Sequence, residues 1–214
     1  MTTTKRPKKV QKPSAVKLQN IDLVGISSAL RRLATAASSN LGSDCYIHAA
    51  TAQQILQRLG AETTLSVGYA AWRVGDGNGD VILHAPLPDM PSQEGVPYHA
   101  WLETDTHVID FTTYQLKAKA ASMDALDGGT TTVTWCPDFL FVTKKSMSSF
   151  ERVVKLRAGL YRYVRVHTLE VQIKAAASPL DEHDVNTAWM LYQNPELQVF
   201  GLNSMPASGE NIHE

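Results

Sequence analysis

Residues 43–60 read SDCYIHAATAQQILQRLG and predict a core helix that begins at a cysteine. Ser43 or Asp44 can accept hydrogen bonds from the free amide N–H groups of the first turn, and Gly60 is the residue type that ends helices in a left-handed conformation. Apolar residues recur at helical spacing and predict one buried face: Cys45, Ala49, Ala52, Leu56 and Leu59, widened by Ile47 and Ile55. A thiol at a helix N-terminus lies at the positive end of the macrodipole, which favours the thiolate. Buried cysteines also behave as small apolar residues, so a purely structural role is the alternative.

The composition predicts one soluble domain. A chain of 214 residues can bury its own core, and its 20 basic and 21 acidic residues nearly balance. This balance gives no general reason to bind nucleic acid, and no apolar run is long enough to span a membrane. Two cysteines far apart in the sequence, and a polar, basic beginning without a signal-peptide pattern, favour the reducing cytoplasm.

Three segments are expected along the chain. Residues 1–17 form a basic tail, rich in lysine with two prolines, that has too few apolar residues to fold. This tail is the one segment whose charge could bind nucleic acid or another anionic partner. Residues 18–200 form a single α+β domain, and residues 201–214 a loose, polar C-terminal tail.

The pattern changes period on either side of the cysteine helix. Residues 21–38 predict an earlier amphipathic helix, whereas 63–71 alternate as a strand would. The glycine-rich residues 75–80 predict a hairpin connection into a strand at 81–83. Further on, we expect helices at 118–126, 148–161 and 181–192, a β-rich run at 130–135 and a strand at 139–142. Residues 164–173 could form a strand or a helix.

Residues 98–103 and 106–111 read YHAWLE and THVIDF and predict two neighbouring strands. If Thr104 and Asp105 form the turn, His99 pairs with Asp110. Directly opposed residues share a face with Cβ atoms about 4.5–5.5 Å apart, so the imidazole and the carboxylate would meet. A longer loop or a one-residue slip would put the two side chains on opposite faces.

A helix with Cys45, a strand with His99 and a strand with Asp110 follow in an order that resembles the transglutaminase-like branch of the papain-like cysteine enzymes. The resembling segments lie at 44–60, 68–72, 99–103 and 108–112, within residues 40–115. The resemblance implies an α+β, papain-like core in which the cysteine-bearing helix packs on an antiparallel sheet. It also implies a cysteine hydrolase or acyltransferase that acts on a peptide, a protein or a small amide.

These three residue types are sufficient for acyl transfer through a thioester. Cys45 would attack a carbonyl carbon, His99 would take and return the proton, and Asp110 would orient the imidazole. The Cys45 backbone N–H is the first candidate oxyanion donor, with Asn40 and Ser43 as further candidates and Trp101 as a possible cleft wall. Papain-type proteases have a glutamine before the cysteine, which this sequence lacks, so proteolysis is not specifically indicated.

Two other interpretations compete with this one. Cys45 with His48, His84 and His99 could ligate zinc, but no tight ligand pair such as CxxC or HExxH occurs, so no metal and no cofactor are expected. Cys136 is expected to be a buried free thiol. The domain could instead be a non-catalytic binding module with the same fold, and nothing in the sequence indicates an oligomeric state.

Overall fold

The computed structural model describes residues 18–38, 41–86, 97–201 and 203. The predicted basic tail, Asn40 and nearly all of the predicted C-terminal tail lie outside these residues. Within the described part, the protein combines helices with an antiparallel sheet, as the sequence predicted in coarse outline. None of the helices described there is both long and apolar enough to cross a membrane.

The sheet has six strands in the described residues and is built around β1, which pairs with three neighbours. The strand order is β2-β1-β3-β4-β5, with β6 also paired to β1, and every pairing is antiparallel. The bounds are β1 Thr64–Arg73, β2 Val81–His84, β3 His99–Glu103, β4 His107–Asp110, β5 Leu140–Thr143 and β6 Tyr161–Arg165.

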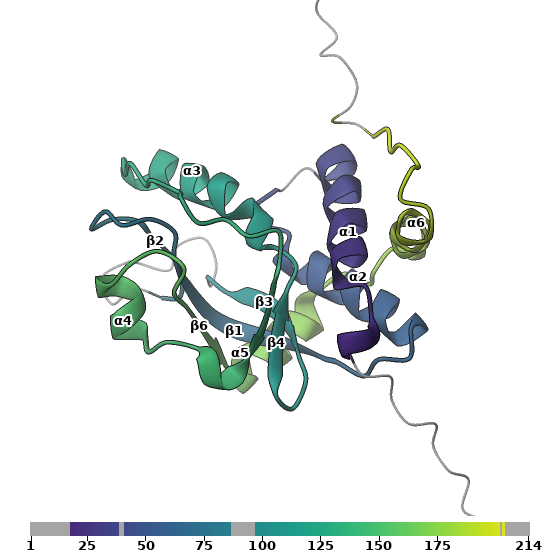
Figure 1. The fold of residues 1–214 in the computed structure, drawn as a ribbon, viewed down its shortest axis with the longest axis horizontal. Helices are drawn as coiled ribbons and strands as arrows, with labels where there is room; N and C mark the ends of the chain where they lie inside the picture. The colour runs from purple at the N-terminus through teal and green to yellow at the C-terminus, as the bar shows by residue number, and fades with distance from the viewer. Residues whose placement is uncertain (1–17, 39–40, 87–96, 202, 204–214) are drawn as a thin grey trace, which may run out of the picture.

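Helices cover the curled sheet on more than one side (Figure 1). The α-helices are α1 Leu23–Ala37, α2 Cys45–Arg58, α3 Leu116–Asp127, α4 Phe150–Lys155, α5 His167–Ala176 and α6 Glu182–Gln193, and short 3-10 turns cover Leu18–Asn20, Thr113–Gln115 and Lys144–Ser146. Helices α1, α2 and α6 pack together, and α2 lies on β3 and β1. Helix α3 approaches β2, whereas α4 packs on β1 and β6.

The helix α2 begins at Cys45, as its sequence predicted, but its first turn is not capped as expected. Asp44 occupies the N-cap position without a side-chain bond to the turn; its carboxylate instead accepts a hydrogen bond from the Ser38 hydroxyl at 3.0 Å. Gly60 has the expected positive φ of 79°. The predicted stripe is buried except at its margins, where Leu59 is half-buried and Ile47 is 56% exposed.

Two apolar clusters fill the core. The larger joins α1, α2, α5 and α6 to the sheet through residues such as Leu56, Val67 and Leu102. The second joins α3 to the sheet and contains Trp72, Trp101 and Tyr163. Both faces of β1 are therefore buried, and its alternating pattern does not mark a solvent face.

The β3–β4 register differs from the prediction. Glu103 pairs with Val108, two residues beyond the predicted partner Thr106, because the connection spans more than Thr104 and Asp105. Thr104 and His107 close this loop through a backbone bond of 3.0 Å. Since side chains alternate with period two, an even shift keeps every side chain on its predicted face.

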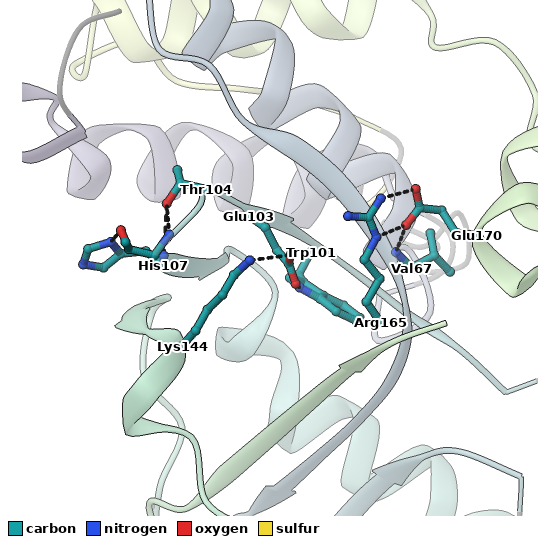
Figure 2. A network of polar contacts seen from close by, with 9 residues as sticks. Val67, Trp101, Glu103, Thr104, His107, Lys144, Arg165 and Glu170 are labelled. Atoms are coloured by element: carbon teal, nitrogen blue, oxygen red, sulfur yellow. Dashed lines mark hydrogen bonds and ion pairs between the residues drawn. The ribbon is translucent and has the colours of Figure 1, made fainter. Parts of the chain in front are cut away.

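Two other local predictions were wrong. Residues 130–135 form no strand, and residues 148–161 contain only the short helix α4 before the chain enters β6 at Tyr161. Strand β6 is tied to α5 by Glu170, which accepts two hydrogen bonds from Arg165 at 2.7 and 2.8 Å and one from the Val67 backbone at 3.3 Å (Figure 2). This tertiary contact stabilises a strand that the local pattern left undecided.

Candidate active site

The three predicted triad residues come together at the junction of the two apolar clusters. Cys45 begins α2, His99 begins β3 and Asp110 ends β4. All three are buried, with exposed fractions of 3%, 0% and 1%. The site is therefore assembled at element ends, where the backbone lets side chains from a helix and two strands converge.

His99 and Asp110 form a buried pair. The His99 Nε2–H donates to Asp110 Oδ2 at 2.8 Å, although the two residues are not directly opposite in the register. Thr112 donates to Asp110 Oδ1 through its backbone N–H and its hydroxyl, both at 2.8 Å, and Tyr163 donates to Oδ2 at 2.7 Å. Although burial raises the pKa of the Asp110 carboxyl, the charge and hydrogen bond of His99 outweigh it and hold the pKa well below its usual range.

Aromatic rings surround the His99 imidazole and fix its plane. Trp72 meets it edge-on with centroids 4.7 Å apart, His84 does so at 5.6 Å, and Trp101 stacks at 6.1 Å. Trp101 is itself held by its indole N–H, which donates to Glu103 at 2.8 Å, and Lys144 donates to the other Glu103 oxygen (Figure 2). This packing leaves the imidazole little freedom to rotate.

The second ring nitrogen of His99, Nδ1, has no hydrogen-bonding nitrogen or oxygen partner within the described residues. The group beside it is the Cys45 thiol. Burial raises the pKa of this thiol, but the hydrogen bond and charge of His99, the charge of Lys119 and a backbone bond with Ala100 outweigh burial, so the pKa is lowered. Burial likewise lowers the pKa of His99, but Asp110 reverses this, so the imidazole pKa is raised. The lowered pKa of the thiol and the raised pKa of the imidazole together favour proton transfer from Cys45 to His99.

A cavity of about 720 Å³ opens beside the cysteine. Ser43, Asp44, Tyr46 and Tyr98 contribute to its wall, so the chain neighbours of Cys45 and His99 line it although the two residues themselves do not. Tyr98 lines the cavity, and its pKa is raised by burial and by the charge of Cys45.

The remaining candidates occupy different positions. Ser43 lines the cavity, Asn40 is outside the described residues, and Trp101 belongs to the core rather than to the cavity wall. His48 is buried, with Nε2 2.9 Å from the Tyr114 hydroxyl, and burial lowers its pKa. His84 has its Nδ1 on the Tyr98 carbonyl at 3.1 Å, and burial lowers its pKa to about 3. Within the described part of the chain, no group of three or more His, Cys, Asp or Glu side chains could hold a metal ion.

Residues 20–127 match a family model described as Protein of unknown function (DUF2026). The chain belongs to the DUF2026 family. A solved crystal structure, described only as a genomics structure, resembles it with a TM-score of 0.57 and 19% sequence identity over 82% of this chain and 81% of that chain. At this identity the likeness concerns the fold alone. No curated protein matched the chain.

The DUF2026 match spans α1 to α3 and contains the three predicted triad residues, but sequence reasoning missed other residues that contact them or their neighbours. Tyr163, on β6, contacts both Asp110 and the indole N–H of Trp72. Lys119, on α3, is 2% exposed, and its Nζ lies 5.3 Å from the Trp72 ring centroid. Neither could be found locally, because Tyr163 alternates like any strand tyrosine and a lysine in a predicted helix is ordinarily solvated.

Proposed function

We propose that this protein is a cysteine-dependent acyl-transfer enzyme with a papain-like, transglutaminase-like core that works through a thioester on Cys45. One observation carries the proposal: a buried His99–Asp110 pair leaves Nδ1 beside a thiol whose pKa is lowered. The order of helix, strand and strand adds support, since it is the order of the resembling enzymes. Perturbed ionisable groups that face one another at the side of a cavity are typical of active sites.

Each step of the reaction has a group to perform it. The Cys45 sulfur attacks the carbonyl carbon and its proton passes to His99 Nδ1. Nδ1–H then protonates the leaving group as the bond from the acyl carbon to the leaving group breaks, which yields the thioester. Water or an amine, deprotonated by Nδ1, attacks the thioester and releases the thiol. The backbone N–H of Cys45, in the first turn of α2, is positioned to stabilise the oxyanion.

Asp110 acts by holding the imidazole. Its hydrogen bond to Nε2–H keeps Nδ1 unprotonated in the neutral ring and stabilises the imidazolium that forms in the reaction. Tyr163 and Thr112 fix the carboxylate in turn, so the acid cannot rotate away from the ring. The surrounding tryptophans exclude water from the pair, which strengthens each of these contacts.

Thiol alkylation tests the nucleophile without a known substrate. Cys136 is the internal reference because it is half-buried and its S–H contacts the carbonyls of Thr113 and Tyr114 at 3.4 and 3.3 Å. Near pH 7, iodoacetamide should label Cys45 faster than the more accessible Cys136. Mass spectrometry of the labelled peptides measures both rates.

His99→Gln should slow Cys45 labelling and move its pH midpoint upward, because the charge and hydrogen bond that lower the thiol pKa are lost. His107→Ala is the matched control, since His107 lies on β4 and its Nδ1 contacts only the hydroxyl of Thr106 at 2.8 Å in the described residues. A folded His99→Gln protein that labels like the native chain would overturn the proposal, as would equally slow labelling of both cysteines. Those results would favour a non-catalytic binding module, for which the 3% exposure of Cys45 is the supporting observation.

A further inference from the structure

The cavity beside Cys45 has a charge pattern that the acyl-transfer mechanism does not use. Its described lining includes three aspartates, Asp44, Asp181 and Asp184, and no lysine or arginine. Most of the remaining wall is apolar and comes from α1, α5 and the segment before α6: Leu30, Leu33, Ala34, Ala37, Ile173 and Leu180. A group that suits this space is positively charged at one point and apolar elsewhere.

Asp44 is the unusual member of this set. Its side chain is only 5% exposed, and its Oδ1 has no hydrogen-bond partner within the described residues. Its Oδ2 accepts from Ser38 and lies 3.4 Å from His48 Nδ1, but burial lowers the pKa of His48, so this imidazole is neutral near pH 7. A buried carboxylate oxygen without a donor is costly, and a ligand ammonium would supply the missing hydrogen bonds and the opposite charge.

The other two carboxylates do not share this position. Asp181 caps α6 by accepting from the His183 backbone N–H at 2.8 Å, and Asp184 lies in the first turn of the same helix. Their charges add to the negative potential of the cavity, but both have roles at a helix start. Asp44 alone is the residue immediately before Cys45, and it contributes to the cavity wall, so of the three carboxylates it is the one next to the proposed nucleophile in the chain.

We propose that this cavity selects acyl substrates that carry a protonated amino group next to the reacting carbonyl and an apolar chain beyond it, as an unblocked N-terminal aliphatic residue does. Asp44 binds the ammonium, the carbonyl carbon faces the Cys45 sulfur, and the apolar chain lies against α1 and Leu180. This inference rests on the proposed function, because it names the substrate class of the same site.

A pair of chloromethyl ketones tests it on the full chain. Leucine chloromethyl ketone carries the free ammonium, and its N-acetyl form lacks the charge. In both reactions the Cys45 sulfur displaces chloride, so a carbon–sulfur bond forms as the carbon–chlorine bond breaks. The native protein should react with the free-amine reagent at least about tenfold faster than with the acetylated one, the factor that one charged hydrogen bond supplies. A glycine analogue should lose part of the rate because it leaves the apolar wall uncovered.

Asp44→Asn should bring the ratio of the two rates, free amine over acetylated, close to one. The ratio is the readout because a change in the reactivity of Cys45 itself affects both reagents equally, and circular dichroism shows that the variant is folded. Asp184→Asn is the matched control for the general charge of the cavity and should keep most of the preference. Equal rates of the two reagents in the native protein, with Cys45 still labelled faster than Cys136, would overturn this inference and leave the proposed function standing. Slow labelling of Cys45 by both reagents and by iodoacetamide would overturn the proposed function itself.

Discussion

Tyr163→Phe removes one hydroxyl from the centre of the site and nothing else. That hydroxyl donates to Asp110 Oδ2 at 2.7 Å and accepts from the Trp72 indole N–H at 2.9 Å. Tyr163 is 3% exposed and Trp72 is fully buried, so water cannot replace either bond. The phenyl ring keeps its place between the tryptophans, and no cavity larger than the lost oxygen is created.

The expected loss in the free energy of unfolding comes from two buried groups, the Asp110 carboxylate and the Trp72 indole N–H, which each lose a hydrogen-bond partner. A hydrogen bond to a carboxylate contributes about 1.5–3 kcal/mol, and a buried indole N–H without an acceptor costs about 1–3 kcal/mol. Losses that share one hydroxyl overlap, so we expect the free energy of unfolding to fall by about 3 kcal/mol. For a chain of this length, that change lowers the melting temperature by about 6–12 °C.

Urea unfolding followed by circular dichroism measures this change. Tyr161→Phe is the matched control: Tyr161 lies two positions earlier on β6, and its hydroxyl makes only a 3.4 Å contact with Ser146 at an exposed position within the described residues. Its loss should alter the free energy of unfolding by no more than about 0.5 kcal/mol. If Tyr163→Phe were as stable as this control, the hydroxyl would not support the Asp110 carboxylate, and the reasoning about the buried pair would be refuted.

Two further predictions concern the sheet. Burial raises the pKa of Glu170, but hydrogen bonds such as that from Arg165 outweigh it and lower the pKa from 4.5 to about 2, so this carboxylate stabilises the fold above pH 4.5 and its contribution is lost as the pH falls toward 2. In urea unfolding, the free energy of unfolding of Glu170→Gln should therefore be lower than that of the native protein at pH 7 by about 1–3 kcal/mol and should fall less steeply in acid. Parallel pH dependences of the two proteins would contradict this. Gly68→Ala should lower the free energy of unfolding by about 3 kcal/mol or more in the same assay, because the added Cβ would lie 2.1 Å from the Val164 carbonyl oxygen. Gly79→Ala is the control, since a Cβ at Gly79 would have no atom within 4 Å. Equal stabilities of the two variants would contradict the close approach of β1 and β6.

Local sequence patterns predicted most elements around the site. The helix that begins at Cys45, the strands that carry His99 and Asp110, and the left-handed Gly60 were all readable, because helix and strand periods and glycine conformation are properties of short segments. The turn between β3 and β4 could not be predicted, because several loop lengths are compatible with Thr104 and Asp105. The observed loop is longer than the predicted one, so the strand register is shifted by two residues. The His99–Asp110 contact survived because alternation repeats every second residue.

The C-terminal part was harder to predict for a different reason. Strand β6 is stabilised by pairing with β1, which is remote in sequence, and by Glu170, which also bonds the Val67 backbone on β1. The helix predicted at 148–161 therefore ends at Lys155. Tyr163 and Lys119 were not predicted as site residues for the same reason, because they lie far from Cys45 and His99 in the sequence. Their positions depend on the packing of β6 and α3 against β1 and on the burial of one hydroxyl and one ammonium.

The sequence by itself determined where the cysteine helix begins, which strands follow it and which faces their side chains share, since these depend on local periodicity. Only the tertiary structure decided that His99 Nδ1 is left beside the Cys45 thiol, that Tyr163 and Thr112 hold Asp110, and that Asp44 contributes to the wall of a cavity. Those features arise where segments that are distant in the sequence pack against one another and exclude water from the contact. Burial of this kind shifts pKa values and leaves polar atoms without partners, and no short stretch of sequence encodes it.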